Sequence, residues 1–378
     1  GPAPHPDHPH RLPHAARGAR PPARAAGVRF ADHAPEAPDL VIDALLGIGA
    51  RAPVDHPLAQ VIASISQSAA PVLCVDVPSG LNADTGTGAT PVGPPGARHT
   101  LSLLTLKPGL FTAQGRDASG EVWLDDLGVT PDPTDMPCAW LGGRTPPRHG
   151  KAGHVHAGHK GSYGDVAVLG GESIRRAGAG MGGAAVLAAR AALQAGAGRV
   201  YLALLQEPHH EGPETDPAYP ELMLRTPQRL TDAALLRDAT LVCGCGGGTA
   251  IAAWLPEVLS RAHRLVLDAD ALNAIAADAA LHPLLRQRRH RGWTTVITPH
   301  PLEAARLMGT TTADVMADRL AAARSLTQQW GVICVLKGSG TVVAAPDETP
   351  WINATGNALL ATAGTGDVLA GLIGAALG

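Results

Sequence analysis

Residues 264–276 have the sequence RLVLDADALNAIA, and this stretch decides the fold class. Its first four residues are mostly branched and apolar, as in a buried strand, and apolar residues then recur at helical spacing. Asp268, Asp270 and Asn273 stand where the strand ends and the helix begins. In parallel sheets with helices on their faces, ligand sites gather at the carboxyl ends of strands. The stretch therefore predicts a strand, a polar turn and a helix of an α/β protein.

The same alternation of strands and helices continues along the whole second half of the chain. Short apolar runs end in glycine-rich turns, and longer stretches with helical spacing follow them. The stretches that show this pattern are residues 164–171, 181–198, 199–205, 239–248, 294–309, 331–346 and 361–378. The pattern predicts an α/β unit with a mostly parallel sheet, and the stretch 331–346 predicts a hairpin within it.

A shorter series of the same kind precedes it. Strand-like and helix-like stretches occupy residues 39–50, 57–66, 71–80, 99–109 and 120–128. The Pro- and Gly-dense stretch 130–151 ends this series and predicts a linker. We therefore expect a disordered or degraded tail over residues 1–38, a first domain over 39–140 and a second over 141–378.

Composition excludes several classes of partner. The net charge is -3 and aromatic residues are only 3% of the chain, which argues against nucleic-acid binding. No apolar run is long enough to span a bilayer, and no signal peptide stands at the N-terminus. The five scattered cysteines indicate reduced thiols and a cytoplasmic protein.

The turn Gly364-Thr365-Gly366-Asp367 opens the last helical stretch. Asp and Thr side chains there can cap a helix, because they accept hydrogen bonds from its free amides. Glycine amides and the positive helix end can equally hold a phosphate, with Asp367 taking a proton from the group that attacks it. The two roles are compatible.

Other polar clusters at the expected strand ends each have two interpretations. The stretch Lys337 to Thr341 is either a connection between strands with an exposed lysine, or a loop that approaches a nucleotide while Lys337 neutralises phosphate. His300 and Glu303 fit a helix cap, and Glu303 could instead hold magnesium through water. The histidines of residues 154–159 suggest a metal cluster, although such tracts are more commonly solvated surface.

Six motifs in the second half resemble those of the NAD(P)H-hydrate dehydratases, whose fold is ribokinase-like. The similarity runs from about Lys160 to the end of the chain. Its motifs are KGSYGDVAVLGG, GAAVLAARAALQAGAG, LDADALN, TPHPLEAARLMG, LKGSGTVVA and TGNALLATAGTGDVLAG. Earlier stretches, DLVIDALLGIGARAP, VLCVDVPSGLNADTGTG and LKPGL, resemble the NAD(P)H-hydrate epimerases, which implies a partial, Rossmann-like three-layer domain. The chain is thus similar to a bifunctional nicotinamide-nucleotide repair enzyme.

The resemblance implies an ADP-dependent lyase that removes water from hydrated NADH or NADPH, with ATP as another phosphate donor and Mg²⁺ as cofactor. Asp367 would be the base and Gly366 part of the anion cradle. The nucleotide loop would consist of Lys337, Gly338, Ser339, Gly340 and Thr341. The residues in contact with the hydrated substrate would be Ala184, Gly246, His300 and Asp367.

The epimerase-like part matches its family only in places. Asp43 and Ser79 stand at potassium-ligand positions, and Asp76 stands where the family has a substrate contact and acid/base; ordinary polar strand ends would explain the aspartates equally well. The substrate loop would consist of Gly47, Ile48, Gly49, Ala50, Arg51, Ala52 and Pro53. The family's Gly- and Asn-rich segment does not precede Asp43, and the chain stops soon after the last helix. We therefore expect a sequence truncated at both ends, with little epimerase activity.

Two alternatives remain from the sequence. One is a ribokinase-superfamily kinase of a small vitamin precursor, and the other is a non-catalytic nucleotide-binding protein. The partners that we expect are hydrated NADH or NADPH, ADP and further copies of the chain in a homo-oligomer. Neither nucleic acid nor a membrane is expected as a partner.

Overall fold

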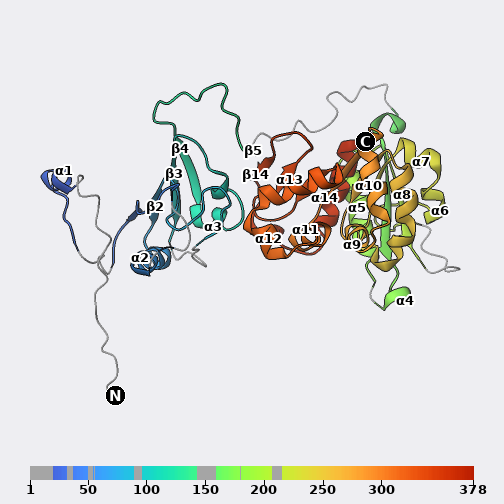
Figure 1. The fold of residues 1–378 in the computed structure, drawn as a ribbon. Coiled ribbons are helices and arrows are strands. Elements are labelled where there is room, and N and C mark those ends of the chain that lie inside the picture. Colours follow the sequence, from blue (N-terminus) through green and yellow to red (C-terminus); the bar gives the residue numbers. More distant parts are fainter. Residues whose placement is uncertain are drawn as a thin grey trace, which may run out of the picture. The chain divides into compact units, whose positions relative to one another are not determined.

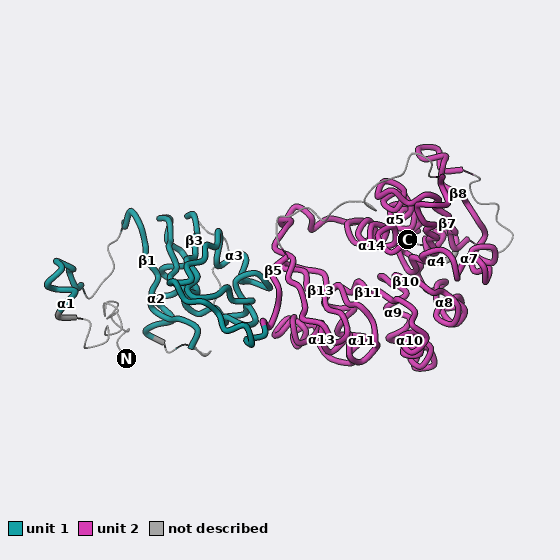
Figure 2. The backbone as a smooth tube through the Cα atoms, turned by 90° about the horizontal axis from the view of Figure 1, so that it is seen from above, with its two compact units in different colours: residues 1–136 teal, residues 137–378 magenta. Residues whose placement is uncertain are grey.

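The structure is a computed structural model that describes residues 20–31, 37–49, 54, 56–88, 96–142, 159–178, 180–206 and 215–378. The chain forms two compact units, residues 1–136 and 137–378, which Figure 2 colours separately. The expected tail is described only in part, as residues 20–31 and 37–38, and it includes helix α1 (Arg20–Ala25). Each unit is an α/β structure, as the sequence predicted.

The first unit contains a sheet of four parallel strands in the order β1-β2-β3-β4. The strands are β1 (Val41–Asp43), β2 (Val72–Val75), β3 (Arg98–Leu103) and β4 (Glu121–Asp125). Helix α2 (His56–Gln67) connects the first two strands, and 3₁₀ helix η1 (Pro108–Leu110) and helix α3 (Gly115–Ser119) connect the last two. The predicted strands and helix of residues 39–128 are therefore confirmed in type and order.

The second unit contains a ten-stranded sheet among its described residues, in the order β5-β14-β13-β12-β11-β10-β9-β6-β7-β8. The seven adjacent strands from β12 to β8 in this order run parallel to one another. The predicted hairpin is confirmed, because β13 pairs antiparallel with β12. The strands are β5 (Trp140–Gly142), β6 (Asp165–Glu172), β7 (Arg199–Leu205), β8 (Met223–Leu224), β9 (Thr240–Cys243), β10 (Arg264–Leu267), β11 (Thr294–Ile297), β12 (Ile333–Leu336), β13 (Val342–Ala344) and β14 (Trp351–Asn353).

Helices cover both faces of this sheet (Figure 1). Helices α5 (Gly182–Gln194) and α14 (Thr365–Leu377) pack against each other and against β6 and β9. A second group of helices packs side by side: α8 (Leu255–Arg261), α9 (Asp270–Ala277), α10 (Leu281–His290), α11 (Pro301–Met308), α12 (Thr312–Ala317) and α13 (Arg319–Trp330). Shorter helical elements complete the unit: η2 (Lys160–Tyr163), α4 (Ile174–Ala177), α6 (Pro227–Leu230), α7 (Ala233–Asp238), η3 (Gly248–Trp254) and η4 (Ala358–Leu360).

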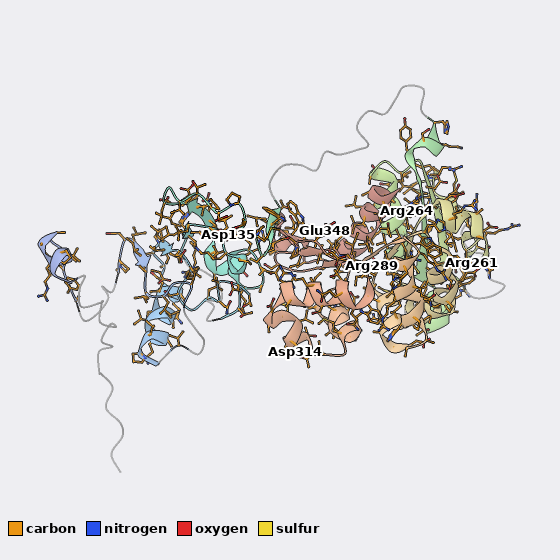
Figure 3. The ribbon with its side chains drawn as sticks, turned by 45° about the horizontal axis from the view of Figure 1, so that its top comes forward. Asp135, Arg261, Arg264, Arg289, Asp314 and Glu348 are labelled. Carbon is orange, nitrogen blue, oxygen red and sulfur yellow. The ribbon has the colours of Figure 1, made fainter. Side chains whose placement is uncertain are left out.

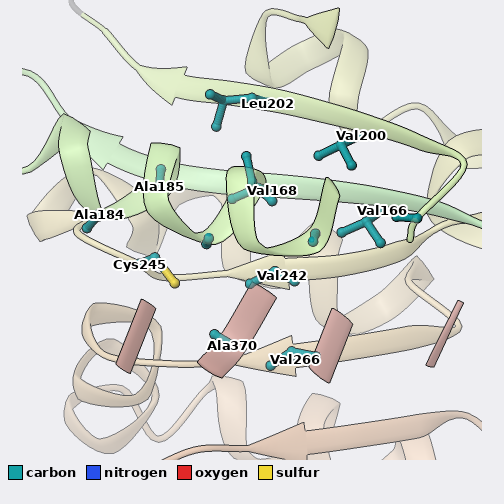
Figure 4. Packing of buried hydrophobic residues seen from close by; sticks show 14 of the residues in the cluster. Val166, Val168, Ala184, Ala185, Val200, Leu202, Val242, Cys245, Val266 and Ala370 are labelled. Carbon is teal, nitrogen blue, oxygen red and sulfur yellow. The ribbon is translucent and has the colours of Figure 1, made fainter. Parts of the chain in front are cut away.

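The core between α5, α14 and the sheet explains why small residues dominate these two helices. Ala185 and Ala188 of α5 and Ala370 of α14 are fully buried against valines of the central strands (Figure 4). Strand residues alternate between the two faces, so Val166 and Val168 of β6 point into this layer. Alanine lets the helices approach closely, and close packing in turn fixes where the first turn of α14 lies relative to the strand ends.

The outer surface of the second unit carries charged side chains. Figure 3 labels Arg261 and Asp314, two exposed examples. Arg261 forms an ion pair with Glu257 at 2.9 Å, and the Asp314 carboxylate caps α12. Among the described residues, every helix is too short or too polar to cross a bilayer.

Candidate active site at the strand ends of the second unit

The centre of the candidate site is an ion pair between two strand ends. The Lys337 ammonium, which follows β12, donates to Asp268 Oδ1 at 2.8 Å, and Asp268 follows β10. Thr298, which follows the intervening strand β11, donates its hydroxyl to the same oxygen at 2.7 Å. Asp268 is only 2% exposed, so the pair lies where water screens charge weakly. Three adjacent parallel strands thus hold one cation and one carboxylate at a fixed place.

Helix α14 brings the catalytic candidate to this pair. Its N-cap is Gly364, with φ 90°, and no side chain caps the helix there. The Thr365 hydroxyl donates instead to the carbonyls of Leu360 and Thr362, so it does not play the capping role considered from the sequence. A Cβ on Gly366 would lie 3.2 Å from Lys337 Nζ, which shows how closely the helix start approaches the ammonium.

Asp367 stands in the first turn of α14 and faces the same cluster. Burial, followed by the neighbouring charge of Asp268, raises the pKa of the Asp367 carboxyl above its ordinary value of 3.8. The nearby Cys245 thiol, which donates to Asp268 Oδ2 at 3.9 Å, and the charge of Lys337 act in the opposite direction. A carboxylate with a raised pKa is a stronger base than an ordinary aspartate, which suits proton abstraction near neutral pH.

Cys245, Asp268 and Asp367 offer ligand atoms that all lie within 4.8 Å of one another. Such a group of atoms could surround a metal ion. Lys337 already supplies a positive charge to it, however, and burial raises the pKa of the Cys245 thiol well above its ordinary value of 9.0. A protonated thiol and a paired carboxylate make poor metal ligands, so we describe the cluster as an acid–base group.

A strained backbone separates the two aspartates of the DAD motif. Ala269 has φ 48° and ψ -114°, a conformation that costs roughly 1–3 kcal/mol for a residue with a side chain. As a result, Asp268 faces Lys337, while Asp270 Oδ2 accepts a hydrogen bond from the Gly248 amide at 2.8 Å. One carboxylate serves the charged cluster, and the other holds the glycine loop after β9.

Glu172, at the end of β6, holds the same loop from the other side. It is 3% exposed, and its Oε1 accepts hydrogen bonds from the Ala250 amide at 3.0 Å and the Thr249 hydroxyl at 3.3 Å. A Cβ on Gly248, which has φ 53°, would lie 1.8 Å from Glu172 Oε2. Only glycine fits there, because the carboxylate occupies the space of a side chain.

Two predicted substrate contacts lie beside each other, Gly246 on this loop and Ala184 in α5. Gly246 has φ 58°, and a Cβ there would lie 2.8 Å from the Ala184 Cβ and 2.5 Å from the Met181 carbonyl oxygen. Ala184, in the first turn of α5, is 9% exposed. Gly246 directly follows Cys245, so these residues adjoin the acid–base group.

His300 and Glu303 form the predicted helix cap. The His300 Nδ1 atom accepts hydrogen bonds from the amides of Leu302 and Glu303, and Glu303 Oε2 accepts one from the His300 amide at 2.8 Å. Burial, then the charge of Lys337, lowers the pKa of His300, while burial raises that of Glu303. Glu303 Oε1 lies 3.2 Å from His300 Nε2, so both carboxylate oxygens contact His300. The helix cap is confirmed, and magnesium held by Glu303 through water stays a prediction.

The predicted nucleotide loop connects β12 to β13. The Lys337 side chain is only 20% exposed and is ion-paired, so the alternative of an exposed lysine is wrong. Behind the loop, Arg319 donates to the carbonyls of Leu336 and Lys337 at 3.1 and 3.2 Å. A Cβ on Gly338, with φ 142°, would lie 2.9 Å from this guanidinium. Arg319 therefore fixes the start of the loop, of which Ser339, Gly340 and Thr341 are the remainder.

The first unit brings together its own predicted residues. Asp43 Oδ1 accepts a hydrogen bond from the Ser79 hydroxyl at 2.5 Å, and Asp43 Oδ2 accepts one from the Ser79 amide at 2.8 Å. The two predicted potassium ligands are thus hard oxygen donors at one place, which fits the chemistry of an alkali cation. Burial and the Asp43 charge also raise the pKa of the adjacent Cys74 to about 12.

Asp76 forms an ion pair with Lys107 in the first unit. Asp76 has φ 71°, and its Oδ1 also accepts the Leu103 amide at 3.2 Å. A Cβ on Gly47 would lie 3.6 Å from Asp76 Oδ2, so the start of the predicted substrate loop adjoins this carboxylate. Ile48 and Gly49 are exposed, whereas the remaining loop residues Ala50, Arg51, Ala52 and Pro53 lie outside the described residues.

Several residues of these sites were not proposed from the sequence. Lys107 lies in the quoted LKPGL motif, whose lysine was a visible signal, and Asp268 lies in the quoted DAD turn. Glu172, Thr298, Arg319 and the role of Cys245 gave no local signal, because only contacts between distant strands reveal them. The histidine cluster of residues 154–159 falls outside the described part except His159, whose Nδ1 accepts the Gly161 amide at 3.1 Å.

Comparisons with known proteins found a matching family model in each part of the chain. The family model described as NAD(P)H-hydrate dehydratase matches residues 167–378, and that of the YjeF-related protein N-terminus matches residues 11–109. The bifunctional NAD(P)H-hydrate repair enzyme Nnr of Escherichia coli strain K12 is 37% identical over 359 residues, which are 91% of this chain. This chain spans 64% of the length of that relative.

Two further known proteins are similar to part of the chain. The ADP-dependent (S)-NAD(P)H-hydrate dehydratase of Neisseria meningitidis serogroup B is 43% identical over 58% of this chain and 71% of its own length. The structure of a ribokinase-like superfamily protein from Enterococcus faecalis V583 has a TM-score of 0.47 and 23% identity, covering 59% of this chain and 74% of that one. The dehydratase family model covers more than half of the chain, and we conclude that the chain belongs to the NAD(P)H-hydrate dehydratase family.

Proposed function

We propose that the second unit dehydrates (6S)-hydrated NADH or NADPH with ADP as phosphate donor. The observation that carries this proposal is the meeting of Asp367, Gly366 and the Lys337–Asp268 pair at the start of α14. It places a base, backbone amides at a helix N-terminus and an ammonium at one point. A phosphoryl transfer to a hydroxyl needs these three components.

In the proposed reaction, the C6 hydroxyl of the hydrated ring attacks the terminal phosphorus of ADP, and Asp367 takes its proton. The bond between that phosphorus and the bridging oxygen breaks, and AMP leaves. The C6–O bond then breaks as the ring nitrogen donates its electron pair, which releases phosphate, and loss of a C5 proton restores the ring of NADH. Lys337 would stabilise the charge on the phosphoryl oxygens.

The remaining contacts assign roles to the neighbouring residues. Ala184, Gly246 and His300 would contact the hydrated substrate, and the loop from Lys337 to Thr341 would contact the nucleotide. Gly246 packs directly against Ala184 and Met181, so these predicted substrate contacts lie together next to Cys245 of the acid–base group. Glu303 as a holder of Mg²⁺ through water is part of the proposal, and no step of the reaction is assigned to the ion.

The sequence predicts little epimerase activity for the first unit; we propose that the activity it retains is epimerisation of the R and S hydrates, with Asp76 as acid/base and Asp43 and Ser79 as potassium ligands. The pairing of Asp76 with Lys107 beside Gly47 supports a polar site next to the predicted loop. Chiral chromatography tests this: with both epimers and ADP supplied, an active first unit consumes both, and an inactive one leaves the R form.

The domain limits 39–140 and 141–378 are part of this proposal, and so are a cytoplasmic location, a homo-oligomeric state and the absence of nucleic-acid or membrane partners. The deciding experiment incubates the protein with hydrated NADH and either ADP or ATP. Absorbance of regenerated NADH with release of phosphate supports a dehydratase. A stable phosphoester without NADH would instead identify a kinase, and binding without turnover would identify a nucleotide-binding protein.

A further inference from the structure

Arg319 is a buried cation directly behind the predicted nucleotide loop, and the proposed reaction gives it no role. It is the first residue of α13 and is only 1% exposed. The Asp318 side chain caps this helix by accepting the Ala321 amide at 2.8 Å, which fixes the backbone from which Arg319 extends. Burial lowers the pKa of the guanidinium to about 10, so the group stays charged at neutral pH.

The guanidinium contacts the backbone of three consecutive residues at the start of the loop. Its Nη2 atom donates to the carbonyls of Leu336 and Lys337 at 3.1 and 3.2 Å. A Cβ on Gly338 would lie 2.9 Å from both Nη1 and Nη2, and the φ of Gly338 is 142°. A side chain at residue 338 would displace the cation, so glycine is what lets this charge lie against the loop.

The direction of the Lys337 carbonyl decides the direction of the next amide. In a planar trans peptide, the C=O of one residue and the N–H of the next point in opposite directions. Because the Lys337 carbonyl points at Arg319, the Gly338 N–H points away from Arg319. Gly338 is exposed, and within the described part of the chain its N–H has no acceptor. This amide is therefore available to a ligand on the side of the loop that faces away from the guanidinium.

We infer that Arg319 is a positioning residue for the nucleotide, which holds the Lys337 carbonyl so that the Gly338 N–H donates to a phosphate oxygen of ADP. The inference rests on the proposed function of the loop from Lys337 to Thr341. Arg319 does not touch the nucleotide and acts through one peptide group. Its hydrogen bond also polarises that peptide, which makes the N–H a stronger donor to an anion.

The first test compares ligand binding by wild type, Arg319→Met and Arg319→Lys. Methionine is long and apolar and has no donor, so it releases the Lys337 carbonyl. Calorimetry should show ADP bound about tenfold more weakly by Arg319→Met, as for loss of a hydrogen bond to a charged group, and hydrated NADH bound as by wild type. Lysine keeps a cation that can hold one carbonyl, so the ADP affinity of Arg319→Lys should lie between the other two.

Arg288→Met is the matched control. Arg288 is also 1% exposed and also donates to backbone carbonyls, those of Leu259 and Ala262, at 3.0 and 2.6 Å. These carbonyls belong to the end of α8 and not to the loop. The control variant should lose stability without a selective loss of ADP. If both methionine variants weaken ADP equally, or if Arg319→Met weakens both ligands equally, Arg319 has only a structural role and the inference is wrong.

A second measurement observes the Gly338 amide in the chain with Arg319 intact. The sequence contains two Lys–Gly pairs, 160–161 and 337–338. Labelling lysine with carbon-13 at its carbonyl and glycine with nitrogen-15 therefore selects two amide signals, and Lys160→Ala removes one, which assigns the other to Gly338. Saturating ADP should move the Gly338 amide proton downfield, because charge-assisted hydrogen bonds are short. The Gly161 signal, from exposed η2, should stay in place.

The dehydration assay separates this inference from the proposed function. Bound ADP without regenerated NADH would refute the proposed dehydration, whereas calorimetry and the Gly338 signal would still decide the role of Arg319. A Gly338 signal that bound ADP does not move would overturn the inference, whether or not the protein turns over. In an active enzyme, Arg319→Met should raise the KM for ADP and leave the KM for hydrated NADH unchanged.

Discussion

Asp367 and Asp268 present carboxylate oxygens within 4.8 Å of each other, although they lie 99 residues apart, on α14 and after β10. The Lys337 ammonium pairs with Asp268 at 2.8 Å. Two negative charges at this distance oppose each other in a partly buried place. Burial, and then the charge of Asp268, therefore explain why the pKa of Asp367 is higher than that of an ordinary aspartate.

The raised pKa of Asp367 has a consequence for stability. Below pH 3.8, the ordinary value, Asp367 is protonated in both the folded and the unfolded chain. As pH rises, the unfolded chain ionises first, so the folded state loses stability until the folded pKa is passed. Asp367→Asn should therefore raise the free energy of unfolding at neutral pH, and by less in acid. Urea unfolding at several pH values measures this, with the exposed Asp347→Asn as control; an equal effect at every pH would contradict it.

Asp367→Asn should also abolish dehydration while sparing nucleotide binding. Asparagine keeps the size of the side chain but cannot take a proton, and removing a general base typically costs ~10²–10⁴-fold in rate. The measurements are kcat with hydrated NADH and ADP, and calorimetric binding of ADP. Turnover near that of wild type would show that another group is the base.

Lys337→Ala should weaken ADP more than hydrated NADH. The ammonium would face phosphate, and a lost hydrogen bond to a charged group corresponds to about 10- to 100-fold in affinity. Calorimetry with each ligand separately measures the two losses, and circular dichroism checks folding because Asp268 loses its partner. Lys160→Ala, at an exposed lysine in η2, should change neither affinity. Equal losses for the two ligands would mean that the loop does not hold the nucleotide.

Gly248→Ala should destabilise the second unit by about 1–3 kcal/mol, because its φ of 53° is strained for alanine and its Cβ would collide with Glu172. Since Glu172 also holds the loop next to Gly246, activity should fall with stability. Gly183→Ala is the matched control: nothing lies within 4 Å of its Cβ, and alanine suits the first turn of α5. Thermal unfolding of both variants measures the two losses of stability. A Gly248→Ala protein as stable as wild type would show that the space beside Glu172 does not require glycine.

The sequence by itself determined the elements, their order and part of the site. Apolar runs such as residues 264–267 strongly favour a buried strand. The glycine turns after such runs mark the strand ends, where polar residues collect. Asp367, Gly366 and Lys337 were therefore candidates from the sequence, the resemblance supplied their roles, and those roles stay a prediction. The six motifs also pointed to the dehydratase family, which the comparisons confirm.

Only the tertiary structure decided which of these polar residues act together. Lys337 had the pattern of an exposed loop lysine, and its burial arises because β10 and β12 flank β11 in the sheet. Cys245, Glu172 and Thr298 lie in unremarkable local sequence, and their partners are 23 to 78 residues away along the chain. Local propensity depends on near neighbours, whereas the charge, burial and hydrogen bonds of a site depend on strand order, and strand order is fixed by packing of the whole sheet.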